Sequence, residues 1–421
     1  MTVGAARASE YETVAMNAGT LTRDVVQHAQ GQGIKLTAMR HQASVDGAEF
    51  NSDETLILSY STDKTARLWD ATTCRQAGPP LRHQAAVTGA EFYRDETRIL
   101  TYSDDGIVRF WDAKSGVPAG PILRHNAAIG GALFTSDESA ILTFSADRTV
   151  RLWNLETGKP IGTPLRHQGA VSDAVFNDDE TRILTYAEDK TVRLWNAATG
   201  APIGATMRHQ DEVGGAYFSS DESLILTHSA DGTARLWDAE NGQPVGEPLR
   251  HQGPVTGAEF NSDESQILTY SDDGTVRFWD VETGAATGPT LRHQAAVGGA
   301  LFSNDESRVL TFSADQTARL WDAESGQLIG KPLRHHAPVG DAYFNDDETL
   351  ILTYTDGKIA RLWDAKTGSP LGTPIRHQAA ITGAVFSDDE TSILTYSEDQ
   401  TIQLWDITGL RTDGSEIERI C

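Results

Sequence analysis

The sequence predicts an all-β fold in which one small antiparallel sheet is repeated nine times. The chain contains nine tryptophans, spaced 42 residues apart from Trp69 to Trp405, and nine histidines follow the same period from His41 to His377. A fixed period over most of a chain indicates one supersecondary unit stacked on copies of itself. Within each unit, short runs of alternating apolar and polar residues are separated by turn residues, which is typical of β-strands.

The repeat that begins at His251 predicts four strands in order. Residues 255–260 form the first, and an Asn-Ser-Asp-Glu-Ser turn leads to the second at 266–270. An Asp-Asp-Gly turn, in which glycine supplies a positive φ, precedes the third strand at 275–279. Residues 290–293 form the fourth strand. Four strands joined by tight turns predict one small antiparallel sheet in each repeat.

This unit resembles the WD repeat of β-propellers, which has about 40–45 residues with Gly-His near its start and Trp-Asp near its end. Here arginine precedes the histidine, and the Trp-Asp pair is kept in seven repeats but is Trp-Asn at Trp153-Asn154 and Trp195-Asn196. The resemblance covers residues 33 to 409. It implies a closed β-propeller of four-stranded blades that acts as a platform for other proteins.

The two ends of the repeated region are complementary. It begins at residues 33–40, which match the fourth-strand segment 160–166, and it stops after a third strand at 401–405. Residues 407–421 do not match a fourth strand. In WD propellers the N-terminal strand usually completes the last blade, so we expect a ring of nine blades closed in this way. The alternative is a ring of seven or eight blades with a remainder outside it, since propellers typically have four to eight.

We expect three parts in the chain, namely an N-terminal extension at 1–32, the propeller at 33–409 and a C-terminal tail at 410–421. The extension is either a capping segment or the remnant of an upstream domain. The tail stops without a clear ending, which predicts that the chain is a fragment of a longer protein.

The net charge of −25 bears on the partners that the protein can take. Nucleic-acid binding depends on lysine and arginine that neutralise phosphates, and anionic membrane surfaces attract basic segments. We therefore expect neither nucleic acid nor membrane as a partner, while a basic protein or peptide stays allowed. No stretch of the sequence approaches the 18 apolar residues of a membrane span.

The chain has only two cysteines, Cys74 and Cys421, which predicts no disulfide framework and a cytoplasmic location. The N-terminus lacks a basic start followed by an apolar core, so it does not resemble a secretory signal. Cys74 stands where the turn glycine is found in the next three repeats. We expect it to be an exposed thiol without a function.

Each repeat also contains a constellation that looks catalytic. A hydroxyl follows the histidine by 18 residues, an aspartate by 22 and the tryptophan by 28, with Asp the one member missing from a single repeat. A hydroxyl with His and Asp allows a nucleophile. In WD repeats, however, the matching residues form a buried hydrogen-bond relay. Nine identical sites with hydroxyls buried beneath tryptophan suit a structural role and not nine active sites. We therefore expect no catalytic residue, metal or cofactor, and structural relays that include His83, Thr101, Asp105, Trp111, His209, Thr227, Asp231, Trp237, His293, Thr311, Asp315 and Trp321.

The repeat that begins at His335 departs from this pattern. It keeps Thr353 and Trp363, but Gly357 stands at the position of the relay aspartate and Asp356 lies one residue early. Either the turn is rebuilt so that Asp356 reaches His335, or this blade lacks one member of the relay.

Two further rings of residues follow the same period. All nine first turns carry Asp-Glu, from Asp53-Glu54 to Asp389-Glu390. One adjacent pair supplies too few oxygens for a calcium loop, so we expect a solvated acidic face. Directly after each relay hydroxyl comes a ring side chain, which we expect to pack between blades. The nine are Tyr60, Tyr102, Phe144, Tyr186, His228, Tyr270, Phe312, Tyr354 and Tyr396.

Partners of WD propellers usually bind the face built by the loops next to the marker histidine and the relay aspartate. In this chain most residues of those loops are Ala and Gly, which provide few anchors. The exceptions are Asp211, Glu212 and His336. Together with His228, the one histidine among the nine ring side chains named above, they are the candidate interaction residues.

These features predict a non-catalytic, monomeric scaffold for other proteins or peptides, within a larger signalling or assembly protein. One alternative is a sensor domain for a peptide or small molecule. Another is an enzyme with its site at the central channel, where the repeat with Gly357 supplies the one asymmetry. A unique cluster of polar residues converging on the channel would favour the enzyme, whereas a broad surface patch would favour binding.

Overall fold

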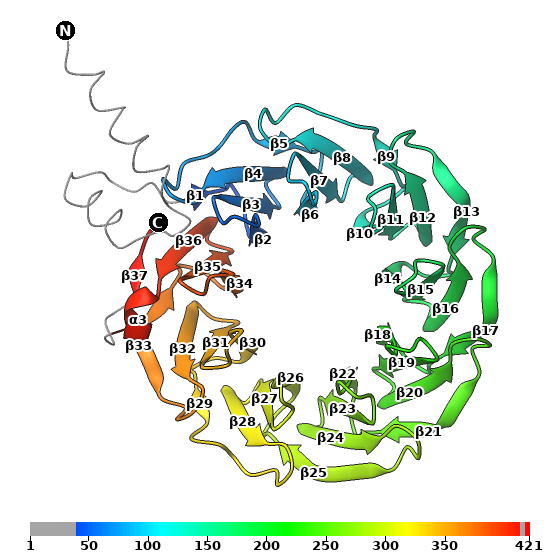
Figure 1. Cartoon of the computed structure of the whole chain (residues 1–421), viewed down its shortest axis with the longest axis vertical. Helices are drawn as coiled ribbons and strands as arrows, with labels where there is room; N and C mark the ends of the chain where they lie inside the picture. The colour runs from blue at the N-terminus through cyan, green and yellow to red at the C-terminus, as the bar shows by residue number, and fades with distance from the viewer. Residues whose placement is uncertain (1–38, 413–416) are drawn as a thin grey trace.

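The computed structural model describes residues 39–412 and 417–421, which form a ring of nine antiparallel sheets (Figure 1). Each sheet is one blade, and we number the blades 1 to 9 along the chain. The prediction of nine blades in a single ring is confirmed, and a ring of seven or eight blades is excluded. The predicted extension at 1–32, and residues 33–38 of the predicted first strand, lie outside the described residues.

Every blade is built in the same order from the centre of the ring outward. The inner strands are β2 (Val45–Phe50), β6 (Val87–Phe92), β10 (Ile129–Phe134), β14 (Val171–Phe176), β18 (Val213–Phe218), β22 (Val255–Phe260), β26 (Val297–Phe302), β30 (Val339–Phe344) and β34 (Ile381–Phe386). The second strands are β3 (Leu56–Ser61), β7 (Arg98–Ser103), β11 (Ala140–Ser145), β15 (Arg182–Ala187), β19 (Leu224–Ser229), β23 (Gln266–Ser271), β27 (Arg308–Ser313), β31 (Leu350–Thr355) and β35 (Ser392–Ser397).

The third and fourth strands lie further out. The third strands are β4 (Thr65–Asp70), β8 (Ile107–Asp112), β12 (Thr149–Asn154), β16 (Thr191–Asn196), β20 (Thr233–Asp238), β24 (Thr275–Asp280), β28 (Thr317–Asp322), β32 (Ile359–Asp364) and β36 (Thr401–Asp406). The fourth strands of blades 1 to 8 are β5 (Leu81–Arg82), β9 (Leu123–Arg124), β13 (Pro160–Arg166), β17 (Pro202–Arg208), β21 (Pro244–Arg250), β25 (Ala286–Arg292), β29 (Leu333–Arg334) and β33 (Pro370–Arg376).

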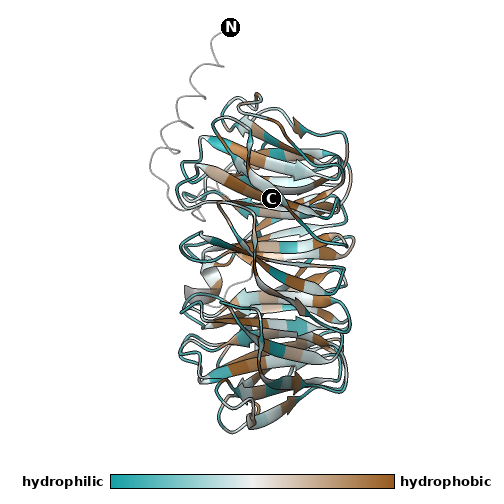
Figure 2. Ribbon diagram, turned by 90° about the vertical axis from the view of Figure 1, so that its right-hand side faces the viewer, coloured by the Kyte–Doolittle hydropathy of each residue, from teal (hydrophilic) through white to brown (hydrophobic). Residues whose placement is uncertain are grey.

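The hydrophobic core lies between neighbouring blades. Between blades 4 and 5, for example, Leu184 and Leu194 of one blade join Ile225 and Trp237 of the next in one buried cluster. The strands carry apolar residues on the sides that face these interfaces, and Figure 2 shows the apolar segments within the strands of a flat, disc-like molecule. Each blade therefore buries its apolar faces only by contact with its neighbours, which explains why the ring must close.

The outer strand of blade 9 is made of both ends of the chain. The N-terminal strand β1 (Met39–Arg40) pairs with the first half of β36, with Met39 opposite Ile402, which confirms the predicted closure. The C-terminal strand β37 (Glu418–Arg419) pairs with the other half, with Arg419 opposite Trp405. In blade 3 one continuous strand, β13, makes both sets of contacts. The pairing of β37 was not predicted, because the tail does not resemble a fourth strand in sequence.

A disulfide joins Cys74, in the loop after β4, to Cys421, with the two Cα atoms 6.1 Å apart. The prediction of an exposed thiol at Cys74 is wrong, because this side chain is 1% exposed and bonded. The two cysteines are 347 residues apart and belong to no repeat pattern, so nothing in their spacing indicated the bond. The disulfide ties blade 1 to the end of the chain that completes blade 9.

The described residues include one short helix, α3 (Thr408–Thr412), between β36 and β37. In the ranges 39–412 and 417–421, no helix has the length and apolar character that a membrane span requires.

Candidate functional site

The marker residues of each repeat form a chain of hydrogen bonds inside the blade. In blade 5, the Trp237 indole Nε1–H donates to Thr227 Oγ1 at 2.9 Å, and this oxygen lies 2.8 Å from His209 Nε2. His209 Nδ1 lies 3.0 Å from Asp231 Oδ2. One set of roles satisfies every group: the tryptophan donates to the hydroxyl, the hydroxyl donates to Nε2, and Nδ1–H donates to the carboxylate. The other two relays singled out from the sequence have the same contacts, in His83, Thr101, Asp105 and Trp111 and in His293, Thr311, Asp315 and Trp321.

Burial makes this relay unsuitable for catalysis. Thr227 is 0% exposed, so no substrate can reach its oxygen. Burial lowers the pKa of His209, although the Asp231 carboxylate opposes the shift. Burial alone would raise the pKa of Asp231, but hydrogen bonds from Thr233 and the Gln210 backbone, with the nearby His209, together lower it. A neutral histidine and an ionised aspartate at pH 7 complete a satisfied buried network.

Blade 8 lacks the fourth member of this network. Thr353 Oγ1 keeps its partners, with His335 Nε2 at 2.9 Å and Trp363 Nε1 at 2.8 Å. Among the described residues, however, no carboxylate is hydrogen-bonded to His335 Nδ1. The Asp356 side chain is exposed and lies instead over Gly340, with Oδ1 3.0 Å from where a Cβ on that glycine would be. Of the two alternatives that the sequence left open, the structure has the one in which this blade lacks a relay member.

The glutamates of the nine Asp-Glu turns connect neighbouring blades. Glu222 accepts hydrogen bonds from the Asp178 backbone N–H and from Asn177 Nδ2 of the preceding blade, both at 2.7 Å. Glu54 closes the circle by accepting from the Asp389 backbone N–H at 3.1 Å. The same backbone contact to the preceding turn is made by Glu96, Glu138, Glu180, Glu264, Glu306, Glu348 and Glu390.

The expectation of a simply solvated acidic face is therefore wrong for these glutamates. They are at least partly buried and have φ angles between 53° and 57°. The aspartates of the same turns are exposed and accept hydrogen bonds within their own turn, as Asp53 does from Thr55. The Asp-Glu pair occurs in all nine turns, and this regularity was the sequence signal that could have indicated a shared role for the glutamate.

The nine ring-bearing side chains that follow the relay hydroxyls pack over the inner strands. Where the third residue of the inner strand is glycine, the ring takes the space of a side chain: a Cβ on Gly257 would lie 1.9 Å from the Tyr270 ring. His228 is 4% exposed, stacks on Tyr217, and has Nδ1 3.2 Å from the Val255 carbonyl oxygen. His228 is therefore not available to a partner at the surface.

The other candidate interaction residues are exposed, but the structure does not bring them together. Asp211 and Glu212 lie in blade 5, where Asp211 forms an ion pair with Lys190 at 2.9 Å. His336 is an exposed residue of blade 8.

A pocket of about 390 Å³ lies at one end of the central channel, across blades 6 to 8. Its walls include the carboxylates of Asp272, Asp341 and Asp356, and apolar side chains that include Phe312 and Val339. In the part of the chain that the structure describes, no three His, Cys, Asp or Glu side chains converge as a metal site.

Asp272 and Asp356 belong to a ring of turn residues around this end of the channel. Each of these residues comes directly before the relay aspartate position of its blade, and all are exposed except Ala230, which is half-buried. In the odd-numbered blades 1 to 7 the residue is Thr or Ala. The acidic members are Asp104, Glu188, Asp272, Asp356 and Glu398.

Three glutamates on the inner strands are buried enough to change their ionisation. Burial raises the pKa of Glu49, Glu91 and Glu259 to about 7. Among the described residues, Glu259 Oε1 is buried without a hydrogen-bond partner. Such a group is protonated more readily in the folded chain than in the unfolded one, so its contribution to stability falls as the pH rises from about 4.5 to 7.

Replacing Glu259 by glutamine is therefore expected to stabilise the protein more at pH 8 than at pH 5, by about 1–3 kcal/mol. Thermal or urea unfolding at the two pH values measures this difference. Burial also lowers the pKa of all nine relay histidines, so the protein loses stability as the pH falls below about 6.5. The wild type and Glu259→Gln share this effect, so it cancels when the two are compared. Glu247→Gln, at an exposed position of β21, is the control. Equal pH dependence of the two variants would contradict the prediction.

The closed ring, the buried relays and the Trp-Asp repeats define a WD-type β-propeller. A family model described as the IFT122 first beta-propeller matches residues 131–406, and the model of the WD domain, G-beta repeat matches residues 34–70 and 80–112. The chain belongs to the β-propeller family that the first of these models describes, and it carries WD repeats.

Solved structures that resemble this chain include the crystal structure of the computationally designed Ika8 protein. It is 23% identical in sequence and has a TM-score of 0.60, with coverage of 77% of this chain and 97% of the designed one. At this identity the likeness shows the fold alone. No curated protein sequence matches the chain significantly.

Proposed function

We propose that this propeller is a non-catalytic interaction scaffold and that it binds a basic segment of a partner protein at the acidic end of its channel. The observation that carries this proposal is the pocket across blades 6 to 8, which is lined by three aspartates and by apolar residues. One of them, Asp356, stands at the turn position that Asp272 occupies in blade 6, one residue before the relay position, and like Asp272 it lines the pocket. The family supports a scaffold in general terms, since WD propellers commonly act as platforms for other proteins.

The chemistry of the pocket suits a lysine or arginine side chain. The aliphatic part of such a side chain can lie against Phe312 and Val339, while its charged end reaches Asp272 or Asp356. The net charge of −25 would also attract a basic partner from a distance and raise the rate of association.

The side chains of the pocket favour binding over catalysis. Its charged groups are all carboxylates. Its hydroxyl, that of Thr256, already donates to the Val297 carbonyl oxygen at 2.9 Å, so it is not poised as a nucleophile. The acidic turn residues Asp104, Glu188, Asp272, Asp356 and Glu398 are spread over five blades around the channel. By the criterion set out from the sequence, such a broad patch favours a binding function over the enzyme.

The oligomeric state and location remain predictions of this proposal. We expect a monomer in the cytoplasm. The disulfide between Cys74 and Cys421 removes one argument for that location, because stable disulfides are typical of oxidising compartments.

The experiment is a titration of the full-length protein with a lysine- and arginine-rich peptide, followed by calorimetry at low and moderate salt. We expect binding that weakens with salt, and an affinity about 3–10-fold lower for the double variant Asp272→Asn/Asp356→Asn. The matched control, Glu240→Gln/Glu247→Gln, removes the same charge from exposed residues of blade 5.

Three outcomes would reject the proposal. These are no binding of the peptide, equal weakening in both double variants, and tight binding of a polyglutamate peptide. If free arginine binds as tightly as the peptide, the pocket belongs to a small-molecule sensor instead.

A further inference from the structure

The last five residues, Ile417–Cys421, form a strap across the outer edge of blade 9. Its strand β37 pairs with β36, and the Ile420 backbone N–H donates to the Leu404 carbonyl oxygen at 2.8 Å. Ile417 and Ile420 are 7% and 2% exposed, and they join two different hydrophobic clusters. The strap is therefore held by apolar contacts as well as by the backbone.

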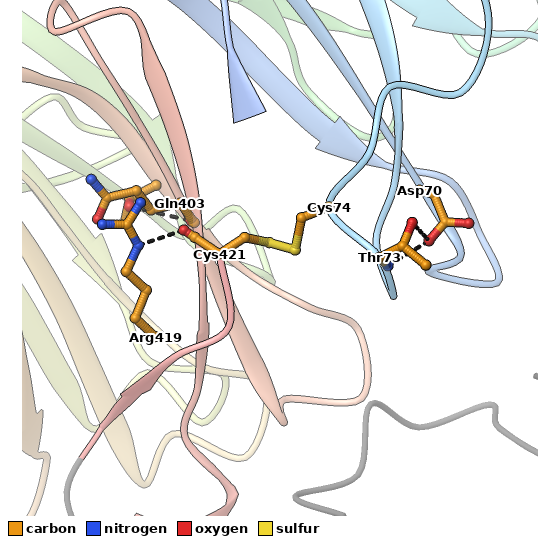
Figure 3. Close-up of a disulfide and its surroundings, with 7 residues drawn as sticks. Asp70, Thr73, Cys74, Gln403, Arg419 and Cys421 are labelled. Carbon is orange, nitrogen blue, oxygen red and sulfur yellow. Dashed lines mark hydrogen bonds between the residues drawn. A yellow bond between two sulfur atoms is a disulfide. The ribbon is translucent and has the colours of Figure 1, made fainter. Parts of the chain in front are cut away.

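The strap also supplies a side chain that blade 9 lacks. In the other eight repeats an arginine stands two residues before the tryptophan. Six of these place the guanidinium 5.8–6.0 Å from the indole ring, as Arg235 does over Trp237. Blade 9 has Gln403 at this position, and Arg419 of the strap lies 6.0 Å from the Trp405 ring instead. Figure 3 shows Arg419 beside Gln403, with Cys421 following it toward Cys74.

The backbone at Cys74 is unfavourable for a cysteine. Its φ is 57°, in the left-handed region that favours glycine. Blades 2 to 8 have glycine at this turn position, with φ between 64° and 71°, at Gly116, Gly158, Gly200, Gly242, Gly284, Gly326 and Gly368. A cysteine at this one position costs backbone energy, which its bond to Cys421 can offset.

We propose that the Cys74–Cys421 disulfide is a reducible latch that holds the strap on blade 9, and that its chemical partner is a dithiol reductant. A thiolate of the reductant attacks one sulfur of the disulfide, the S–S bond breaks, and the other cysteine leaves as a thiolate that takes up a proton. The second thiol of the reductant then attacks the mixed disulfide and releases the remaining cysteine. Two electrons pass to the two cysteines, and the reductant becomes a disulfide.

The position of the bond makes this reaction depend on movement of the strap. Cys74 and Cys421 are 1% and 3% exposed, so a reductant reaches the sulfur atoms only when the strap lifts from β36. After reduction the strap is held only by non-covalent contacts, namely its two-residue strand, its two isoleucines and Arg419 over Trp405, and it lifts more often. The released half of β36 then presents an unpaired edge next to the contact between blades 9 and 1. The oxidised protein is the closed form, and the reduced protein is the form with an open outer edge.

Hydrogen exchange with the full-length protein tests this latch independently of any partner. The cysteines are first counted by alkylation, and the oxidised protein is then compared with protein reduced by dithiothreitol. We expect no alkylation before reduction, and at least tenfold faster exchange at Ile420 and Cys421 after it. Exchange in β19 and β20 of blade 5 should not change. Two reactive thiols before reduction, or unchanged exchange in the strap after complete reduction, would overturn the proposal.

Three substitutions distinguish a disulfide that stabilises the strap from a cysteine at position 74 that has no role. Cys74→Gly restores the glycine of the other blades, so without a latch it should raise the melting temperature. With the latch, we expect the melting temperature of Cys74→Gly to lie below that of the oxidised wild type. We expect it to equal or exceed that of the reduced wild type. Cys421→Ser should resemble the reduced wild type, and Cys74→Ser should be less stable than Cys74→Gly. A melting temperature of Cys74→Gly above that of the oxidised wild type would contradict the latch.

Discussion

Removal of residues 1–40 is expected to open the ring, to lower the melting temperature and to cause aggregation. This deletion takes away β1, whose Met39 is fully buried in the cluster between blades 9 and 1. Loss of the buried methionine alone costs about 2–5 kcal/mol, and the first half of β36 loses its hydrogen-bonding partner. Unpaired strand edges pair readily with other chains, so the expected product is an oligomer or aggregate.

Calorimetry and light scattering after size-exclusion chromatography measure the two effects. A variant that lacks only residues 1–32 keeps the predicted strand and is expected to behave like the full chain. The point variant Met39→Ala is expected to lose stability without exposing a strand edge. A monomer with an unchanged melting temperature after removal of residues 1–40 would show that β1 does not close the ring.

Replacing Thr227 by valine is expected to destabilise the protein by about 2–5 kcal/mol. The change keeps the shape of the side chain but removes the oxygen that binds both Trp237 Nε1–H and His209 Nε2. Each buried polar group that loses its partner costs about 1–3 kcal/mol. Trp237→Phe, which removes the donor instead, is expected to lower the melting temperature as well, without creating or removing any activity.

The altered blade provides the control for this prediction. Asp231→Asn should destabilise the protein by about 1–3 kcal/mol, since Asp231 is hydrogen-bonded to His209 and caps its turn. Asp356→Asn makes the same chemical change in blade 8, where the side chain bonds no relay histidine, and should alter stability by less than about 0.5 kcal/mol. Urea unfolding compares the variants, and equal losses would mean that the relay contact is not what stabilises a blade.

Much of the fold could be predicted because the same sequence pattern occurs nine times along the chain. The spacing of Trp69 to Trp405 defined the unit, and the match of residues 33–40 with a fourth strand predicted how the ring closes. At the altered repeat, Gly357 marked where the relay fails, but the side-chain direction of Asp356 stayed open. That direction depends on the space over Gly340, on a different strand.

The sequence by itself determined the all-β class, the number of repeats and the residues that meet inside each blade, because local patterning repeated at a constant period acts within one unit and its neighbour. That all nine repeats close in one ring was shown by the tertiary structure. Tertiary structure alone decided three contacts that lie outside this period or between blades. The Cys74–Cys421 bond arises because ring closure places blade 1 beside blade 9, and Arg419 lies over Trp405 because β37 pairs with β36. The glutamate contacts, such as Glu54 with the Asp389 backbone, arise because the turns of adjacent blades lie side by side.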